Sequence, residues 1–232
     1  MGTGTLTGEG AVAEPSVTGP SVAVFDLDGT LCRGDSFAGF LRRSMLDGRL
    51  RAALSLAAAV VLVPLFLLPA GRRRAVRGFV LLATAGRSAA QLAEMAAQFA
   101  VEHVAKGRIE PVLERLCEHR ERGDRVVVAT GCAEPLASAV CRELGLGDVE
   151  VLAAALAPGR FAHRPVRGCL GVQKVARLGE LGIAVPVAHA YTDSSVDLPL
   201  LRAAERRFLV EPRPRTVARV RAALGPEFTV LG

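Results

Sequence analysis

The sequence predicts an α/β fold, in which helices connect the strands of a parallel sheet and a helical cap is inserted after the first strand. Two patterns predict it. From Glu110 onward, short apolar runs alternate with helical stretches, which is typical of parallel strands with crossover helices. Before that point, a helical block from about Asp35 to Ala105 separates the first strand from the others. A chain of 232 residues, half of them hydrophobic, can bury such a core and a small inserted domain.

The first strand is expected at Ser21–Phe25, because the apolar run SVAVF ends in the polar turn D26-L-D28-G-T. The later elements are expected as a helix over 110–122, a strand over 125–130, a helix over 134–144, a strand near 150–154, a helix after 172, a strand near 188–192 and a strand over 207–212. Residues 1–20 lack apolar periodicity and are expected to form a disordered lead. The predicted domains are therefore a core of 21–34 with 106–232 and a cap of 35–105.

The formal net charge of +6 is concentrated in the segment that comprises the cap and Lys106. Between Gly34 and Lys106 there are ten basic and four acidic residues, a difference that equals the whole surplus. A local basic excess indicates an anionic partner. With one Tyr and no Trp, the chain offers little on which bases could stack, so no nucleic-acid partner is expected. An anionic membrane surface is the favoured partner.

Reactive side chains are predicted at the carboxyl ends of the strands, where open parallel sheets bind ligands. They are Asp26 and Asp28 after the first strand, Thr130 after VVVA, Asp193 and Asp197 after the strand near 188–192, and Lys174 at the start of a helix. Four carboxylates in one cleft repel one another unless a cation compensates. Oxygen ligands favour Mg²⁺, and the chain's five cysteines and four histidines lack the spacing of a zinc site.

This set of groups suits phosphoryl transfer. A carboxylate beside Mg²⁺ is a competent nucleophile toward phosphorus, and a second carboxyl two residues later can protonate the leaving oxygen and then deprotonate the hydrolytic water. Lys174 would neutralise phosphoryl oxygens and keep the nucleophile ionised, while Thr130 would donate a hydrogen bond to the phosphoryl group. The sequence thus predicts a phosphate-ester hydrolase with Mg²⁺ as cofactor.

These motifs resemble those of phosphatases of the haloacid dehalogenase superfamily, which have a Rossmann-like core. The matching stretches are D26-L-D28-G-T, V-V-V-A-T130-G, Lys174 and Y-T-D193-S-S-V-D197. The resemblance implies that Asp26 is the nucleophile and Asp28 the acid and base, and that Mg²⁺ is held by Asp26, the backbone carbonyl of Asp28 and Asp193. It also implies that Asp197 orients this set and that Gly131 contacts the substrate. Arg164 and Arg167, in HRPVRGCLG, are candidates to bind a second anionic group of the substrate, with a solvated basic loop as the alternative.

The cap contains an uninterrupted stretch of twenty uncharged residues, Ala52 to Gly71, with arginines on both sides. Its length would allow a membrane span. However, Pro64 would kink the helix, and both ends of the insertion must return to one core, which requires an even number of crossings. We therefore expect a helical hairpin that dips into, or lies on, the cytoplasmic side of the cell membrane, monotopic or re-entrant. The alternative is a buried helix in the cap of a cytoplasmic protein.

The hydrophobic cap narrows the resemblance to the phosphoserine-phosphatase-like branch, and within it to the phosphatidylglycerophosphatase C type, through the phrases G71-R-R-R, T130-G-C-A-E-P-L and R167-G-C-L-G-V-Q-K174. The resemblance implies hydrolysis of a membrane lipid phosphate, phosphatidylglycerophosphate, to phosphatidylglycerol. One alternative is a soluble phosphatase for a small ester such as phosphoserine. Another is an inactive membrane-bound scaffold on the same fold, which the intact set of Asp26, Asp28, Lys174 and Asp193 opposes.

Overall fold

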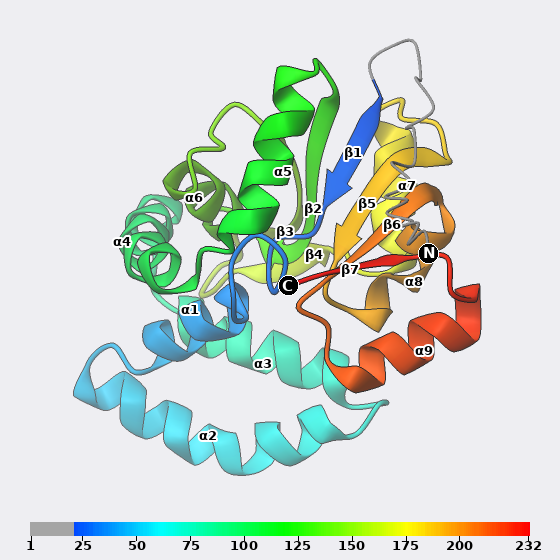
Figure 1. The fold of residues 1–232 in the computed structure, drawn as a ribbon. Helices are drawn as coiled ribbons and strands as arrows, with labels where there is room; N and C mark the ends of the chain where they lie inside the picture. Colours follow the sequence, from blue (N-terminus) through cyan, green and yellow to red (C-terminus); the bar gives the residue numbers. More distant parts are fainter. Residues whose placement is uncertain (1–20) are drawn as a thin grey trace, which may run out of the picture.

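The computed structural model describes residues 21–232, and the lead expected at 1–20 lies outside the described residues. Seven described strands form one sheet in the order β4-β3-β2-β1-β5-β6-β7 (Figure 1). They are β1 (Val22–Phe25), β2 (Arg125–Ala133), β3 (Glu150–Ala157), β4 (Arg164–Arg167), β5 (Val187–Thr192), β6 (Ala204–Val210) and β7 (Thr229–Leu231). All neighbouring strands are parallel except β3 and β4. The predicted α/β fold is confirmed.

Four helices lie in the insertion between β1 and the crossover helix. They are α1 (Ser36–Met45), α2 (Arg49–Leu67), α3 (Arg72–Thr84) and α4 (Ala89–Gly107). The crossover helix α5 (Glu110–Glu121) then leads to β2. The remaining described helices are α6 (Leu136–Glu143), α7 (Val172–Glu180), α8 (Leu198–Arg202) and α9 (Pro214–Leu224), with a 3-10 turn at Ser195–Asp197.

Strand β1 lies at the centre of the sheet and is buried on both faces. Ala23 and Phe25 pack into a core shared with α4, α5 and α6, whereas Val24 packs into a core shared with α7, α8 and α9. Such double burial explains why this strand is an unbroken apolar run. Its register places Phe25 beside Val128 of β2 and Tyr191 of β5. The residues that follow these strands are therefore brought to one edge of the sheet.

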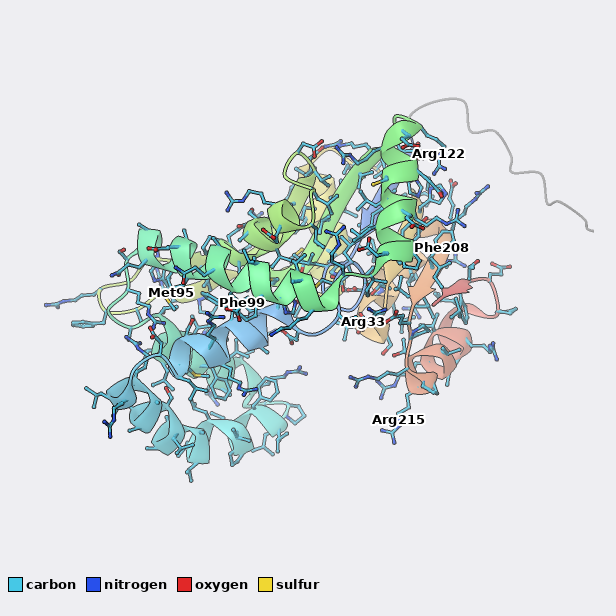
Figure 2. All side chains as sticks on the ribbon, turned by 60° about the vertical axis from the view of Figure 1, so that its left-hand side comes forward. Arg33, Met95, Phe99, Arg122, Phe208 and Arg215 are labelled. Carbon is cyan, nitrogen blue, oxygen red and sulfur yellow. The ribbon has the colours of Figure 1, made fainter. Side chains whose placement is uncertain are left out.

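Helix α4 joins the insertion to the main core. The Ser88 side chain and Gln91 form a capping box at its start. One stripe of the helix is buried in the main core: Leu92, Ala96, Ala100 and Val104. On α4, Phe99 (Figure 2) packs edge to face with Phe40 of α1 at 5.9 Å between ring centroids. Because α4 shares the main core, a separate cap with the boundaries 35–105 stays a prediction.

Helices α1 and α3 lie across the carboxyl ends of the central strands (Figure 1). Leu41 of α1 and Val80 of α3 belong to a small cluster of their own, against which Leu156 of β3 packs. The backbone N–H of His163, between β3 and β4, donates to Thr84 Oγ1 at 2.9 Å. The hairpin of β3 and β4 thus supports the far end of α3.

Helix α2 is the outermost layer, beyond α3 (Figure 1). Ser55 is its only buried residue. Among the described helices, α2 alone is long and apolar enough to cross a membrane by length and composition. Its apolar side chains are largely exposed, at 75% for Val60 and 76% for Leu67. A helix that is apolar all round is normally buried in protein or lipid, and α2 is not buried in protein.

Strand β4, helix α9 and strand β7 were not predicted. Strand β4 has only four residues, RPVR, of which one is a proline. Helix α9 begins at Pro214, and the three-residue β7 follows it at the edge of the sheet. Short, polar edge elements give little periodicity, because few of their side chains are buried.

Candidate active site

The carboxyl ends of β1, β2 and β5 converge on one site. Asp26 follows β1 directly, and Asp193 follows β5. Strand β2 extends three residues beyond Thr130, but its pairing with β3 is irregular between Ala129 and Ala133. At this irregularity the Cys132 N–H donates to Thr130 Oγ1 at 3.0 Å. The predicted reactive residues therefore lie on adjacent strands of one sheet edge.

Lys174 is the charged centre of the site. It lies in the first turn of α7, is fully buried, and its Nζ is 2.8 Å from Asp26 Oδ1 and 2.6 Å from Asp197 Oδ2. Thr192 Oγ1 donates to the same Asp197 oxygen at 3.0 Å. Removing an ammonium from water costs several kcal/mol unless carboxylates and hydrogen bonds compensate, and here two carboxylates do so.

Asp28 is held by the start of α1. The backbone N–H of Ser36 donates to Asp28 Oδ1 at 3.1 Å, and the Ser36 hydroxyl lies 3.0 Å from Asp28 Oδ2. The N–H of a first helical residue has no partner within its helix, so Asp28 satisfies a group that α1 leaves free. Asp26 takes no part in this contact. Its Oδ1 accepts from the N–H of Leu27 at 2.8 Å.

Asp193 lies directly against Gly29, the residue after Asp28. A Cβ atom at Gly29 would fall 2.5 Å from Asp193 Oδ2, so only glycine allows this approach. Gly29 also has φ = +78°, a conformation that side chains with a Cβ rarely adopt. The glycine of the D-L-D-G-T turn thus brings Asp193 next to the loop that carries Asp26 and Asp28.

Residues 23–202 match the family model described as haloacid dehalogenase-like hydrolase. The chain belongs to this family. The match includes every reactive residue predicted from the sequence, and the prediction of a hydrolase is confirmed.

Solved structures show the same fold. A protein of unknown function from Bordetella pertussis Tohama I is 23% identical, with a TM-score of 0.74 over 93% of this chain and 99% of its own. A phosphoserine phosphatase bound to substrate is 14% identical, with a TM-score of 0.59 over 93% and 94%. A phospho-aspartyl intermediate analogue of phosphoserine phosphatase is 15% identical, with a TM-score of 0.57 over 92% and 94%. At these identities the likeness concerns the fold.

Burial shapes the electrostatics of this haloacid dehalogenase-like site. It raises the pKa of Asp26 to about 6, although the ammonium of Lys174 opposes the rise. Burial also raises the pKa of Asp28 to about 7, against the hydrogen bonds from Ser36. Burial lowers the pKa of Lys174, but the two carboxylates outweigh it and the net shift is upward. Asp28 therefore combines a raised pKa with a fixed orientation, which suits a proton donor and acceptor.

The oxygen donors of the site fit a divalent cation. Within residues 21–232 no group of three or more His, Cys, Asp or Glu side chains is arranged to hold a metal. The predicted magnesium site needs only two carboxylates, Asp26 and Asp193, and the backbone carbonyl of Asp28. Of the four predicted carboxylates, Asp26 and Asp197 pair with Lys174, and Asp197 Oδ1 is buried without a hydrogen-bond partner within the described residues. An oxygen-only set with excess negative charge suits Mg²⁺.

The predicted substrate contacts are less closely grouped. Gly131 follows Thr130 in β2, and the Leu170 side chain packs against it. Arg164 is exposed on β4, and Arg167, at the end of that strand, pairs with Glu180 of α7. No described contact joins either arginine to the carboxylates, so their binding to substrate stays a prediction.

Sequence reasoning missed two residues that touch the reactive set: Ser36, through its hydroxyl and N–H on Asp28, and Cys132, through its backbone N–H on Thr130. The Ser36 hydroxyl lies 3.2 Å from Cys132 Sγ as well as contacting Asp28. Asp35 is a favourable N-cap residue, and its side chain does accept from the Ala38 N–H. That signal locates the start of a helix, but it does not reveal that the helix begins against Asp28.

Proposed function

We propose that this hydrolase cleaves phosphate monoesters through a phosphorylated Asp26. The observation that carries the proposal is the buried pair of Asp26 and Lys174 beside an independently held Asp28. Lys174 favours the ionised form of Asp26 and contacts its Oδ1, and it would neutralise the oxygens of an incoming phosphoryl group. Mg²⁺, held by Asp26, Asp193 and the Asp28 carbonyl, would supply further positive charge to that group.

The proposed reaction has two displacements at phosphorus. Asp26 attacks the phosphorus, the ester bond breaks, and Asp28 gives its proton to the leaving oxygen. Asp28, now ionised, takes a proton from water, whose oxygen attacks the aspartyl-phosphate and releases inorganic phosphate and free Asp26. Thr130 would donate to a phosphoryl oxygen during both steps.

For the substrate we propose a membrane lipid phosphate, phosphatidylglycerophosphate, as the sequence resemblance implies. Helix α2 supports a site of action at the membrane, because burying one exposed Leu or Val side chain in an apolar phase is worth about 1.5–3 kcal/mol. The exposed arginines Arg73, Arg74 and Arg77 of α3 make no ion pair within the described residues and would attract anionic lipids.

The contacts between α2 and α3 favour binding of α2 in the plane of the cytoplasmic leaflet over an α2 that spans the membrane. The inner side of α2 is packed against α3, with Leu62 against Gly78 and Leu65 against Gly71. Arg51 donates to the carbonyls of Leu82 and Ala85 at 2.7 and 2.8 Å and so ties the start of α2 to the end of α3. A crossing would have to break these bonds, whereas shallow insertion of the outer side leaves them intact.

The test is phosphate release from matched substrates with Mg²⁺ and with a chelator. Phosphatidylglycerophosphate in anionic vesicles, phosphatidate in the same vesicles and soluble phosphoserine would be compared. The proposal expects metal-dependent release that is fastest from phosphatidylglycerophosphate. Preference for phosphoserine would favour a small-ester phosphatase of the phosphoserine phosphatase type, and no release from any ester would favour an inactive scaffold. Full activity in chelator would contradict the role of Mg²⁺.

A further inference from the structure

Ser36 engages both oxygens of one carboxylate. Its N–H donates to Asp28 Oδ1 and its hydroxyl lies within hydrogen-bond distance of Asp28 Oδ2, at 3.1 and 3.0 Å. Ser36 is itself fully buried. A carboxyl group bound through one oxygen can still rotate about its last torsion, whereas two donors on a single residue fix the plane of the group.

Cys132 is the second neighbour of the Ser36 hydroxyl, beside Asp28. The Cys132 sulfur lies 3.2 Å from Ser36 Oγ, and Cys132 is 1% exposed. Burial raises the pKa of this thiol well above its usual value, so the sulfur keeps its proton. A protonated thiol can donate to the Ser36 oxygen, which leaves the hydroxyl proton free to bind Asp28.

We infer that Ser36 is a positioning residue that holds Asp28 in the orientation needed for proton transfer. The inference rests on the proposed function, because it assigns Ser36 a role only through Asp28. Ser36 touches neither Asp26 nor Lys174 through any described bond, so its effect is confined to the acid and base.

The position of Ser36 also makes Asp28 dependent on α1. Phe40 of α1 packs on Phe99 of α4, and Leu41 packs with Val80 of α3. The helix that orients the acid is thus held by the other helices of the insertion. Asp26 and Lys174 belong to the sheet edge and α7, and they are independent of this support.

The leaving group distinguishes a positioning role from a general structural one. Departure of p-nitrophenolate needs little protonation, whereas departure of an alkoxide needs a proton from Asp28. The comparison uses kcat/KM, which reports only the steps up to departure of the leaving group and not the later hydrolysis of the aspartyl-phosphate that both esters share. We expect Ser36→Ala to lower kcat/KM for the alkyl ester dihexanoyl phosphatidate by about tenfold or more, and for p-nitrophenyl phosphate by less than about threefold. Ser44→Ala is the matched control: Ser44 is also buried on α1, but its hydroxyl has no partner within the described chain.

A double-mutant cycle completes the test. If Ser36 acts only through Asp28, Ser36→Ala should cause no further loss in an Asp28→Asn background. Equal losses on both esters, additive losses in the cycle, or an unchanged Ser36→Ala enzyme would overturn the inference while leaving the phosphatase intact. A wild-type protein that hydrolyses neither ester would instead overturn the proposed function, and this inference with it.

Discussion

Two regions of this molecule depart from the usual rule that charges face water and apolar side chains face the core. At the sheet edge, Lys174 and Asp197 are at most 2% exposed. On α2, Val60 and Leu67 are about three-quarters exposed. The buried charges at the edge are paired with one another within the chain. The apolar side chains of α2 have no such cover within the described protein, and only an apolar phase outside it would bury them. The comparison teaches that the two halves of the proposed function, chemistry and location, are built on separate elements.

The largest expected effect is on the chemistry. Asp26→Asn should reduce phosphate release to background, a loss of at least about a thousandfold, because an amide is a poor nucleophile of nearly the same shape. Binding to anionic vesicles should not change, since α2 is untouched. Asp148→Asn, an exposed acid paired with Arg120, is the control. Substantial turnover by Asp26→Asn would rule out the aspartyl-phosphate route.

The second-largest expected effect is on the free energy of unfolding, through the buried charges at the carboxyl edge of the sheet. Lys174→Met leaves two buried carboxylates without their counter-charge, and removing one partner of a buried ion pair costs about 3–5 kcal/mol. Chemical denaturation in chelator should show this loss in the free energy of unfolding. The chain's other lysine, Lys106, is exposed on α4, and Lys106→Met should leave stability unchanged. An equally small effect of both substitutions would mean that the buried charges are not held by one another.

A smaller effect on the free energy of unfolding distinguishes α2 from α4. These two helices have equal length and lie in the same insertion. Leu92→Ala on α4 removes a side chain that is 2% exposed and should cost about 2–5 kcal/mol. Leu67→Ala on α2 should change stability by no more than about 0.5 kcal/mol in detergent-free buffer. If Leu67→Ala proves as costly as Leu92→Ala, α2 is packed against protein in solution and the comparison fails.

The sequence predicted which residues meet at the edge of the sheet better than it predicted the residues that support them. Asp26, Thr130 and Asp193 could be placed together because the carboxyl ends of neighbouring parallel strands meet. Ser36 could not, because its contact with Asp28 depends on where α1 begins in space. No spacing of residues in the sequence indicates the position of that helix start relative to Asp28.

The surroundings of the apolar helix α2 could not be predicted, for a similar reason. The apolar run of α2 was visible, but a sequence cannot tell a buried apolar helix from an exposed one. Arg51, the arginine directly before the apolar run, donates to two carbonyls at the end of α3. Arg167 similarly pairs with Glu180. Long arginine side chains find local acceptors that only the folded chain reveals.

The most direct test of the account measures vesicle binding and phosphate release together for a variant with Val60→Asp and Leu67→Asp. Both residues lie on the exposed side of α2, and each acid in hydrocarbon costs on the order of 2.5–3.5 kcal/mol. The control carries Val101→Asp and Val230→Asp, two exposed valines outside α2. We predict that the α2 variant no longer floats with anionic vesicles and loses hydrolysis of vesicle lipid, but still cleaves p-nitrophenyl phosphate at nearly the wild-type rate. Wild-type protein that does not bind vesicles, or an α2 variant that still hydrolyses their lipid phosphate, would contradict it.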